Sequence, residues 1–178
     1  VDNDLYRTTG EAASLACAVE RLAGECLIAY GDILFRHHIL DQLFAHPGDI
    51  VVTVDALWRE RVSQAKNWVR DFAACTRAFS PTFLDDEPVH LRRIAPDMPA
   101  EEIGGEWMGL AKLSARGAER VREAILAMRR DGTLAKAGLP ELFTRMAGEG
   151  APIHVLYVAG QWLDVDDAAD LAEAGKFP

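Results

Sequence analysis

Several aspartates of this chain lie where a carboxylate could take part in metal chemistry. Asp32 follows the apolar run 26–30 and a glycine, and Asp164 and Asp166 are two residues apart in an extended stretch. In an open α/β sheet the ligand crevice lies outside the carboxyl ends of the strands. Residues two apart in an extended chain point to one face. Mg²⁺ takes one or two carboxylates and completes its shell with water and substrate phosphate oxygens. The pattern therefore predicts a magnesium site formed by these three acids.

The same residues have simpler interpretations. Gly-Asp after a strand is common in plain turns, and Asp166 is also a suitable N-cap for the helix whose first turn contains Asp167 and Asp170. His37 and His38 are consecutive in a helical pattern, about 100° apart, and cannot bind one metal together. No serine lies in a Gly-x-Ser-x-Gly frame. The residues thus indicate a cation site without indicating a reaction.

The elements that must position these acids alternate along the chain. Apolar stretches without alternating polarity predict strands, with less regular ones in the middle: 26–30, 49–55, 68–76, 88–94, 107–113 and 153–158. Apolar residues at helical spacing predict helices: 8–22 with Thr8 as its N-cap, 39–44, 114–130, 139–148 and a terminal helix. This order predicts an α/β fold with a mixed, mostly parallel central sheet and helices on both faces.

Composition narrows the function class. The 178 residues are enough for one domain, 1–178, and 49% hydrophobic and 26% charged residues are typical of a globular protein. A formal net charge of −9 argues against nucleic-acid binding, which needs a basic face. No apolar run approaches the ~20 residues of a membrane span, and no signal peptide is visible. The odd number of cysteines, three, suits a reducing compartment. We expect a cytoplasmic enzyme acting on small molecules, with no membrane or nucleic-acid partner.

The order and spacing of six segments indicate a likeness to a known group of proteins. They are Leu5-Tyr6-Arg7-Thr8-Thr9, Ser14-Leu15, Tyr30-Gly31-Asp32-Ile33-Leu34-Phe35, Val54-Asp55, Gly105-Glu106-Trp107-Met108-Gly109-Leu110 and Gly160-Gln161-Trp162-Leu163-Asp164-Val165-Asp166. With them the chain resembles, over almost its whole length, the nucleotidyltransferase superfamily that makes sugar nucleotides and CDP- or CMP-linked compounds. The resemblance implies a Rossmann-like, GT-A-like sheet that lacks its first βα unit.

Two of these segments resemble one subfamily in particular. Gly31-Asp32-Ile33-Leu34-Phe35-Arg36, followed by Val54-Asp55-Ala56-Leu57-Trp58, looks most like the cytidylyltransferase domain attached to phosphoenolpyruvate phosphomutases in phosphonate pathways. This likeness implies transfer of CMP from CTP to a small phosphonate, such as 2-aminoethylphosphonate or 2-hydroxyethylphosphonate, with release of pyrophosphate. It also implies a fused or associated mutase, or a second copy of the chain, as a partner.

The resemblance assigns roles to individual residues. Asp32 and Asp166 match the catalytic acids that hold Mg²⁺ at the nucleotide phosphates, and Asp164 is implied as a further metal ligand. Glu106 matches a residue that touches the acceptor, and Asp55 is a candidate for the same pocket, where its charge would favour an ammonium group. The candidate substrate-binding residues are thus Glu106, Asp55 and, from the second matched segment, Ser14.

One part of the family pattern is expected upstream. The Gly-rich loop with Arg and Lys, which grips the nucleotide triphosphate, would lie before Asp4, so we expect the chain to begin inside the catalytic domain and to bind CTP poorly by itself. Two other functions stay open: a sugar 1-phosphate or phosphocholine nucleotidyltransferase, and a non-catalytic domain that packs against a mutase. The retention of Asp32, Asp164 and Asp166 favours catalysis.

Overall fold

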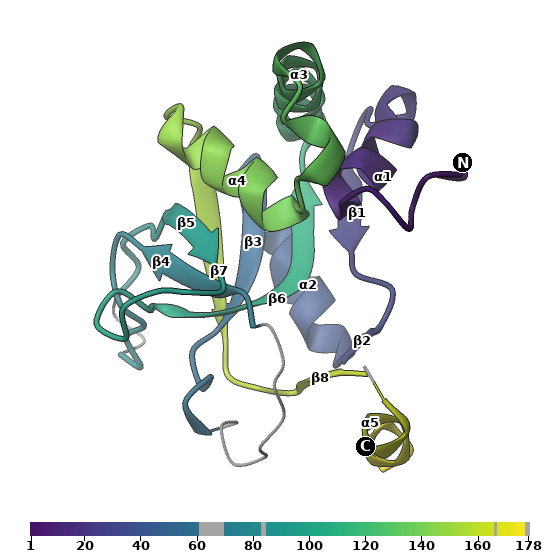
Figure 1. Cartoon of the computed structure of the whole chain (residues 1–178). Coiled ribbons are helices and arrows are strands. Elements are labelled where there is room, and N and C mark those ends of the chain that lie inside the picture. The colour runs from purple at the N-terminus through teal and green to yellow at the C-terminus, as the bar shows by residue number, and fades with distance from the viewer. Residues whose placement is uncertain (61–69, 83–84, 166, 177–178) are drawn as a thin grey trace.

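A central β-sheet organises the molecule (Figure 1). The computed structural model describes residues 1–60, 70–82, 85–165 and 167–176. Within these residues, six strands form one sheet, in the order β5-β4-β6-β3-β7, with β1 pairing to β6. The strands are β1 (Cys26–Ala29), β3 (Ile50–Asp55), β4 (Phe72–Cys75), β5 (Leu91–Ala95), β6 (Gly105–Leu113) and β7 (Ile153–Val158).

Strand directions show that the sheet is mixed. β6 is antiparallel to β1, β3 and β4, and β5 is antiparallel to β4, whereas β3 and β7 are parallel neighbours. Consequently β1, β3, β4 and β7 point one way, and β5 and β6 point the other way. The mixed α/β class is confirmed, with most of these strands sharing one direction, although β3 and β7 form the one parallel neighbouring pair among the described strands.

Helices cover both faces of the sheet, as predicted. On one face, α1 (Glu11–Cys17), α3 (Ala115–Asp131) and α4 (Leu139–Gly148) share one hydrophobic core with alternate residues of β3, including Ile50 and Val52. On the other face, α2 (His37–Ala45) packs through Ile39 and Leu43 on Val51. The alternation follows from the strand geometry, because successive side chains of β3 point to opposite faces.

The second half of the chain folds close to its predicted pattern. The bounds of α4 and β7 coincide with the predicted ranges 139–148 and 153–158, and α3 is displaced by one residue. Ser114 caps α3, since its hydroxyl oxygen accepts the backbone N–H of Gly117 at 3.1 Å. Ala118, Val121, Ile125 and Met128, which recur along α3 at helical spacing, are all buried.

The predicted start of the first helix is wrong. α1 begins at Glu11 with Gly10 as its N-cap, and the Thr8 hydroxyl instead donates to the carbonyl of Leu5 at 3.1 Å. Tertiary contact explains the shift. The N–H of Gly10 donates to Ala135 O, and that of Ala12 to Ala137 O, so backbone carbonyls take the place of a capping side chain. A Cβ at position 10 would overlap the carbonyl of Ala137.

Asp32 and Asp164, two of the three predicted metal ligands, lie at a separate two-stranded sheet and not at the edge of the central sheet. β2 (Ile33–Phe35) pairs antiparallel with β8 (Trp162–Asp164), and α5 (Ala168–Ala174) follows. The expectation that one sheet edge would join them is therefore corrected: β1 ends at Ala29, and the chain reaches Asp32 through a turn before starting a new strand. Asp166 lies outside the described residues.

Among the described helices, none has both the length and the hydrophobicity that a membrane span requires.

Candidate active site

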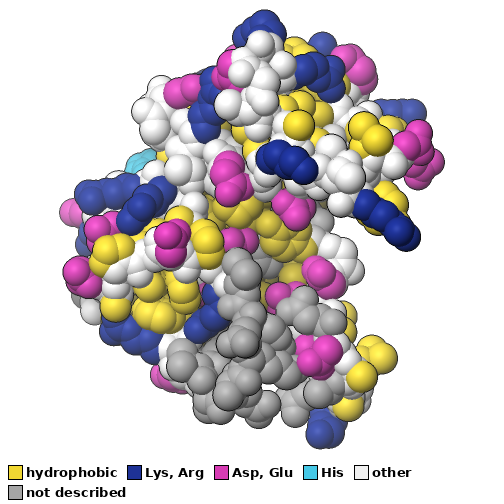
Figure 2. Space-filling model, in the orientation of Figure 1, with side chains coloured by type: hydrophobic (Ala, Val, Ile, Leu, Met, Phe, Trp, Pro, Cys, Tyr) yellow, Lys and Arg dark blue, Asp and Glu magenta, His cyan; other side chains and the backbone are white. Residues whose placement is uncertain are grey.

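An acidic cleft lies between the N-terminal segment, the start of α4 and the β2–β8 sheet. Its volume is about 810 Å³. Figure 2 shows acidic side chains gathered around a hollow on this face of the molecule. Its charged and aromatic lining residues are Arg7, Glu11, Tyr30, Asp32, Asp71, Lys136, Glu141 and Asp164. Carboxylates outnumber basic groups in this lining, so the cleft has a negative potential that favours a cation.

Asp32 and Asp164 meet at the rim of this cleft. In the β2–β8 pairing, Ile33 lies opposite Asp164, and the next backbone bond runs from Val165 N–H to Asp32 O at 2.9 Å. Asp32 is exposed and Asp164 half-buried. These two residues, separated by more than a hundred positions in the chain, line the same cleft. That their carboxylates hold one metal ion stays a prediction.

The side chains present fit a divalent ion that keeps much of its own hydration. Two carboxylates at one cleft, with space for water and phosphate oxygens, match the ligand set that Mg²⁺ prefers. Among the described residues there is no group of three or more His, Cys, Asp or Glu side chains arranged to hold a metal. Asp166, the third predicted ligand, is not among the residues described. Asp32 and Asp164 are thus the candidate ligands that the structure locates.

Tyr30 directs the chain from β1 toward the cleft. Its N–H donates to Gly109 O at 3.0 Å, and its ring lies edge-on to Trp107 with 5.2 Å between the centroids. Gly109 has a φ of 77°, and a Cβ there would overlap the Tyr30 ring, so this bulge of β6 requires glycine. Burial, together with the carboxylate of Asp71, raises the pKa of the Tyr30 phenol, which is therefore neutral.

Asp71 is the carboxylate most affected by its surroundings. Burial and the neighbouring carboxylates of Glu141, Glu11, Glu106 and Asp164 raise its pKa to about 6. Both effects disfavour the charged form. A group perturbed in this way inside a cleft is typical of a functional site.

Two glutamates reach the cleft from the ends of helices. Glu141, in the first turn of α4, accepts the N–H of Gly138 at 2.7 Å. Gly138 separates it from Glu11, the first residue of α1, since a Cβ on Gly138 would lie 2.8 Å from an oxygen of each carboxylate. Lys136, just before, donates to the carbonyl of Thr8 at 2.6 Å and ties the N-terminal segment to this wall. The packing of α1 against α4 therefore brings like charges together.

Asp55 is placed differently from the cleft acids. It ends β3, is fully buried and does not belong to the lining described above. One carboxylate oxygen accepts the N–H groups of Leu57 and Gly160, and the other accepts the indole N–H of Trp162, each at 2.9 Å. Its predicted contact with the acceptor stays a prediction. The contacts that the structure describes join β3 to β8.

Glu106 and Ser14, the other predicted substrate-binding residues, also lie outside the cleft lining. Glu106 is buried opposite Asp55 in the β3–β6 pairing and accepts two hydrogen bonds from the guanidinium of Arg70, one of them at 2.9 Å. Ser14 is exposed on α1 and accepts a hydrogen bond from Asn3 at 2.9 Å. Glu106 still acts on the cleft, through its charge on Asp71.

Asp71, Glu11 and Glu141 are cleft residues that the sequence pattern did not identify as functional. Asp71 does not fit the pattern of acids at the carboxyl ends of strands, because it precedes its strand, β4. β4 is shifted along the sheet so that its first residue, Phe72, lies opposite Glu106, which also pairs with the last residue of β3. The start of β4 therefore lies where β3 ends. Glu11 and Glu141 have the ordinary signature of first-turn helix acids.

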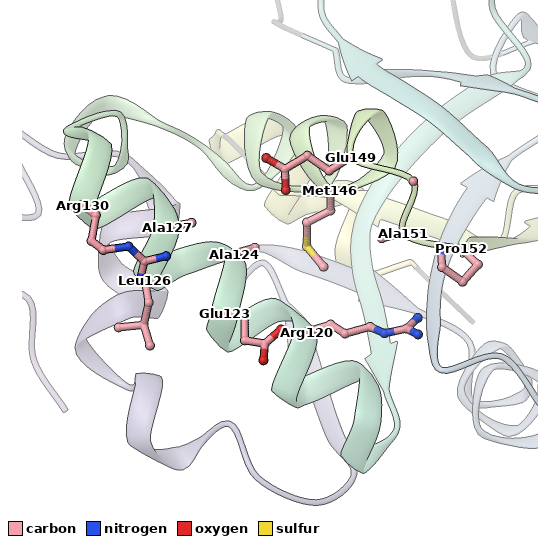
Figure 3. Close-up of a pocket in the computed structure, with 11 residues that line it drawn as sticks. Arg120, Glu123, Ala124, Leu126, Ala127, Arg130, Met146, Glu149, Ala151 and Pro152 are labelled. Carbon is pink, nitrogen blue, oxygen red and sulfur yellow. The ribbon is translucent and has the colours of Figure 1, made fainter.

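A second hollow is distinct from this cleft. It has a volume of about 630 Å³ and lies between α3 and the end of α4, where Met146 points into it (Figure 3). Arg120 and Glu123 come from α3, and Glu149 follows α4. It shares no residue with the acidic cleft, and none of the predicted site residues that the structure describes lines it.

Comparison with known proteins defines the class of fold. No protein-family model and no curated protein match the sequence. Among solved structures, the inositol-1-phosphate CTP transferase from T. maritima superposes with a TM-score of 0.72 at 14% identity, over 99% of this chain and 64% of that one. The CTP:phosphocholine cytidylyltransferase from Streptococcus pneumoniae gives 0.62 at 16%, over 98% and 66%. A UDP-glucose pyrophosphorylase in complex with UDP-glucose gives 0.64 at 12%, over 95% and 61%.

These neighbours are nucleotidyltransferases, and the chain has their fold. It spans less than two thirds of the length of each of the three. The likeness is one of fold, because sequence identity is low throughout.

Proposed function

We propose that the chain is the catalytic part of a nucleotidyltransferase that moves CMP from CTP to a small phosphonate and releases pyrophosphate. The observation that carries the proposal is the meeting of Asp32 and Asp164 at one acidic cleft, in the fold of nucleotidyltransferases. Two carboxylates beside an open cleft suit a divalent ion with phosphate ligands. The fold alone does not determine the reaction.

In the proposed reaction, a phosphonate oxygen of the acceptor forms a bond to the α-phosphorus of CTP. The bond from that phosphorus to the oxygen bridging to the β-phosphorus breaks, and pyrophosphate leaves with the electron pair. The attacking oxygen is already anionic, so the step needs no general base. Asp32 and Asp164, with Asp166, would hold Mg²⁺. When bound, this ion would supply neutralisation of charge on the leaving group.

The rest of the cleft would position the two substrates. Arg7 and Lys136 are its basic lining residues and would contact phosphate or phosphonate oxygens. Glu11, Asp71 and Glu141 form an acidic wall, which would attract an ammonium group and repel a purely anionic acceptor. This charge distribution favours 2-aminoethylphosphonate over 2-hydroxyethylphosphonate. An associated phosphoenolpyruvate mutase, as the subfamily resemblance implies, would supply the carbon–phosphorus bond of the acceptor.

A phosphocholine or sugar 1-phosphate acceptor is the second candidate. Solved structures of the same fold are named for phosphocholine, inositol 1-phosphate and UDP-glucose. Phosphocholine also carries a positive ammonium group, so the acidic wall suits it as well. A neutral sugar would gain less from the charges of Glu11, Asp71 and Glu141.

Turnover by variants of the full-length protein tests the proposal. With Mg²⁺, CTP and a panel of phosphonate and phosphate acceptors, pyrophosphate release should be largest with an amino-bearing acceptor. Asp32→Ala and Asp164→Ala should each lower turnover by at least ~10²-fold, the scale for removing an electrostatic stabiliser. Asp41→Ala, which removes an exposed carboxylate of α2, is the matched control and should keep the full rate. Normal rates in both cleft variants would exclude the metal assignment.

A further inference from the structure

Asp55 connects β3, a fully buried strand of the sheet, to the strand that carries Asp164. All six residues of β3 are buried, and β3 lies between β6 and β7. Among the described contacts of Asp55, the N–H groups of Gly160 and Trp162 belong to the segment that enters β8. A hydrogen-bonded carboxylate on such a strand is a rigid point of attachment, because moving it would disturb the core.

The turn that Asp55 holds is strained. Gly160 and Gln161 have φ values of 65° and 64°, and left-handed backbone at a non-glycine residue costs about 1 kcal/mol. Such a conformation persists only where neighbouring contacts over-determine it. Here the Gly160 N–H is held by Asp55, and the carbonyl of Gln161 accepts the N–H of Arg36 at 3.1 Å. Trp162 then packs with Ile39, Leu43 and Val51 in the core on that face.

This turn sets the place of both candidate metal ligands. Asp164 is two residues beyond Trp162, and Trp162 pairs with Phe35 in the β2–β8 sheet. The same pairing continues to the bond from Val165 N–H to Asp32 O. A shift of β8 would therefore move Asp164 directly and Asp32 through its pairing.

We propose that Asp55 is a positioning residue: by holding the Gly160 N–H and the Trp162 indole N–H, it sets the position of Asp164 and, through the β2–β8 pairing, that of Asp32. Its importance for a bound divalent ion rests on the function proposed above. A carboxylate is suited to the task because the described donors, of Leu57, Gly160 and Trp162, converge on two oxygens that donate nothing. An asparagine would keep the shape but would turn an NH₂ group toward at least one donor.

Two variants of the full-length protein remove different parts of the contact. Asp55→Asn disturbs the convergence of donors, and Trp162→Phe removes the indole N–H while keeping an aromatic ring. The first readout is hydrogen exchange of the Val165 amide, followed by NMR or mass spectrometry, which reports the β2–β8 pairing without any metal. The second is binding of Mn²⁺, measured by electron paramagnetic resonance. Faster exchange and Mn²⁺ binding weakened about tenfold or more are expected, as for other partners that orient metal ligands.

Thr53→Val is the matched control. Thr53 lies on the same strand, two residues before Asp55, and its buried hydroxyl donates to Leu110 O at 3.1 Å. Its loss should lower stability without changing Val165 exchange or Mn²⁺ affinity, so a general loss of stability is separated from positioning.

The outcomes separate the two proposals. Unchanged Val165 exchange and Mn²⁺ affinity in folded Asp55→Asn and Trp162→Phe would overturn the positioning role. If the unmodified protein binds no Mn²⁺ but Asp55→Asn still speeds Val165 exchange, the positioning role stands and the metal-dependent function fails. Should Asp55→Asn not fold, Trp162→Phe alone decides by the same two readouts.

Discussion

Two groups of acids lie near the same end of the sheet. The charges of one group are compensated by hydrogen-bond donors, and those of the other face further carboxylates. Asp55 and Glu106, opposite each other on β3 and β6, are both buried, and each is met by donors: three N–H groups for Asp55 and the guanidinium of Arg70 for Glu106. In the cleft, the half-buried Asp71 instead faces the carboxylates of Glu11 and Glu141.

The difference separates structural acids from acids suited to bind a ligand. A buried charge is tolerated when hydrogen bonds or an ion pair replace its lost hydration. Carboxylates that mainly face one another retain an unfavourable electrostatic energy, which a bound cation relieves. The raised pKa of Asp71 is the sign of that energy.

The largest expected effect comes from removing Arg70, the cation that pairs with the buried carboxylate of Glu106. Arg70→Met should lower the free energy of unfolding by about 3 kcal/mol, because it leaves a buried carboxylate beside Asp55 without its cation. Denaturation with urea measures the loss. The double variant Arg70→Met/Glu106→Gln should recover much of it, since the uncompensated charge is gone. A double variant no more stable than Arg70→Met would show that Arg70 does not stabilise the protein by compensating the charge of Glu106.

In the cleft, removing the charge of Asp71 should raise the free energy of unfolding rather than lower it. The pKa of Asp71 is raised from its ordinary value of 3.8 to about 6, so the folded state binds the proton more tightly than the unfolded state. Its protonation therefore contributes stability that is full below pH 3.8 and is lost as the pH rises through 6. Asp71→Asn, always neutral, should stabilise the protein at pH 7.5 by about 1 kcal/mol, less than the full shift implies because the cleft is open to water.

The pH dependence distinguishes this effect from a change in packing. The gain from Asp71→Asn should disappear near pH 4, where the native aspartate is also neutral. Urea denaturation of both proteins at the two pH values measures it. A gain that is equal at both would attribute the effect to packing.

The smallest expected effect concerns basic groups, a cluster of histidines at the other end of β7. His154 lies between His46 and His90, with ring centroids 5.2 and 4.5 Å apart. Burial is the main cause that lowers the pKa of His46 and of His154. The charges of His154 and Lys112 lower the pKa of His46 further. The charge of His90 lowers the pKa of His154 further, and the carboxylate of Asp49 partly offsets this lowering. The folded state therefore resists protonation. Stability is full above the ordinary pKa of 6.5 and falls as the pH drops below it.

His154→Gln should reduce this loss between pH 7.5 and 5.5 by roughly 0.3 kcal/mol, a small value because the histidines are only half-buried. Thermal unfolding at the two pH values measures it. His38→Gln, an exposed residue of α2, is the control and should keep the acid sensitivity of the unmodified protein. The prediction fails if both variants respond alike.

Much of the fold was predictable because it depends on local periodicity. α3, α4 and β7 follow from apolar residues at helical or strand spacing, and their observed bounds agree with the predicted ones to within a residue. Asp32 was singled out because it follows an apolar run and a glycine, and Asp164 because it stands two residues before Asp166 in an extended stretch; both line the cleft. Thr8 was misjudged as a helix cap because the true partners of the helix start are carbonyls at positions 135 and 137.

What the order of residues could not settle was how segments pair at a distance. Asp71 enters the cleft only because β4 pairs with β6 in a particular register, and Asp55 holds Trp162 across more than a hundred positions. Local sequence determines which residues can form a helix, a strand or a charged turn, since those depend on neighbours within a few positions. Which carboxylate meets a donor and which meets another carboxylate was decided by tertiary structure, because register and packing depend on the whole chain at once.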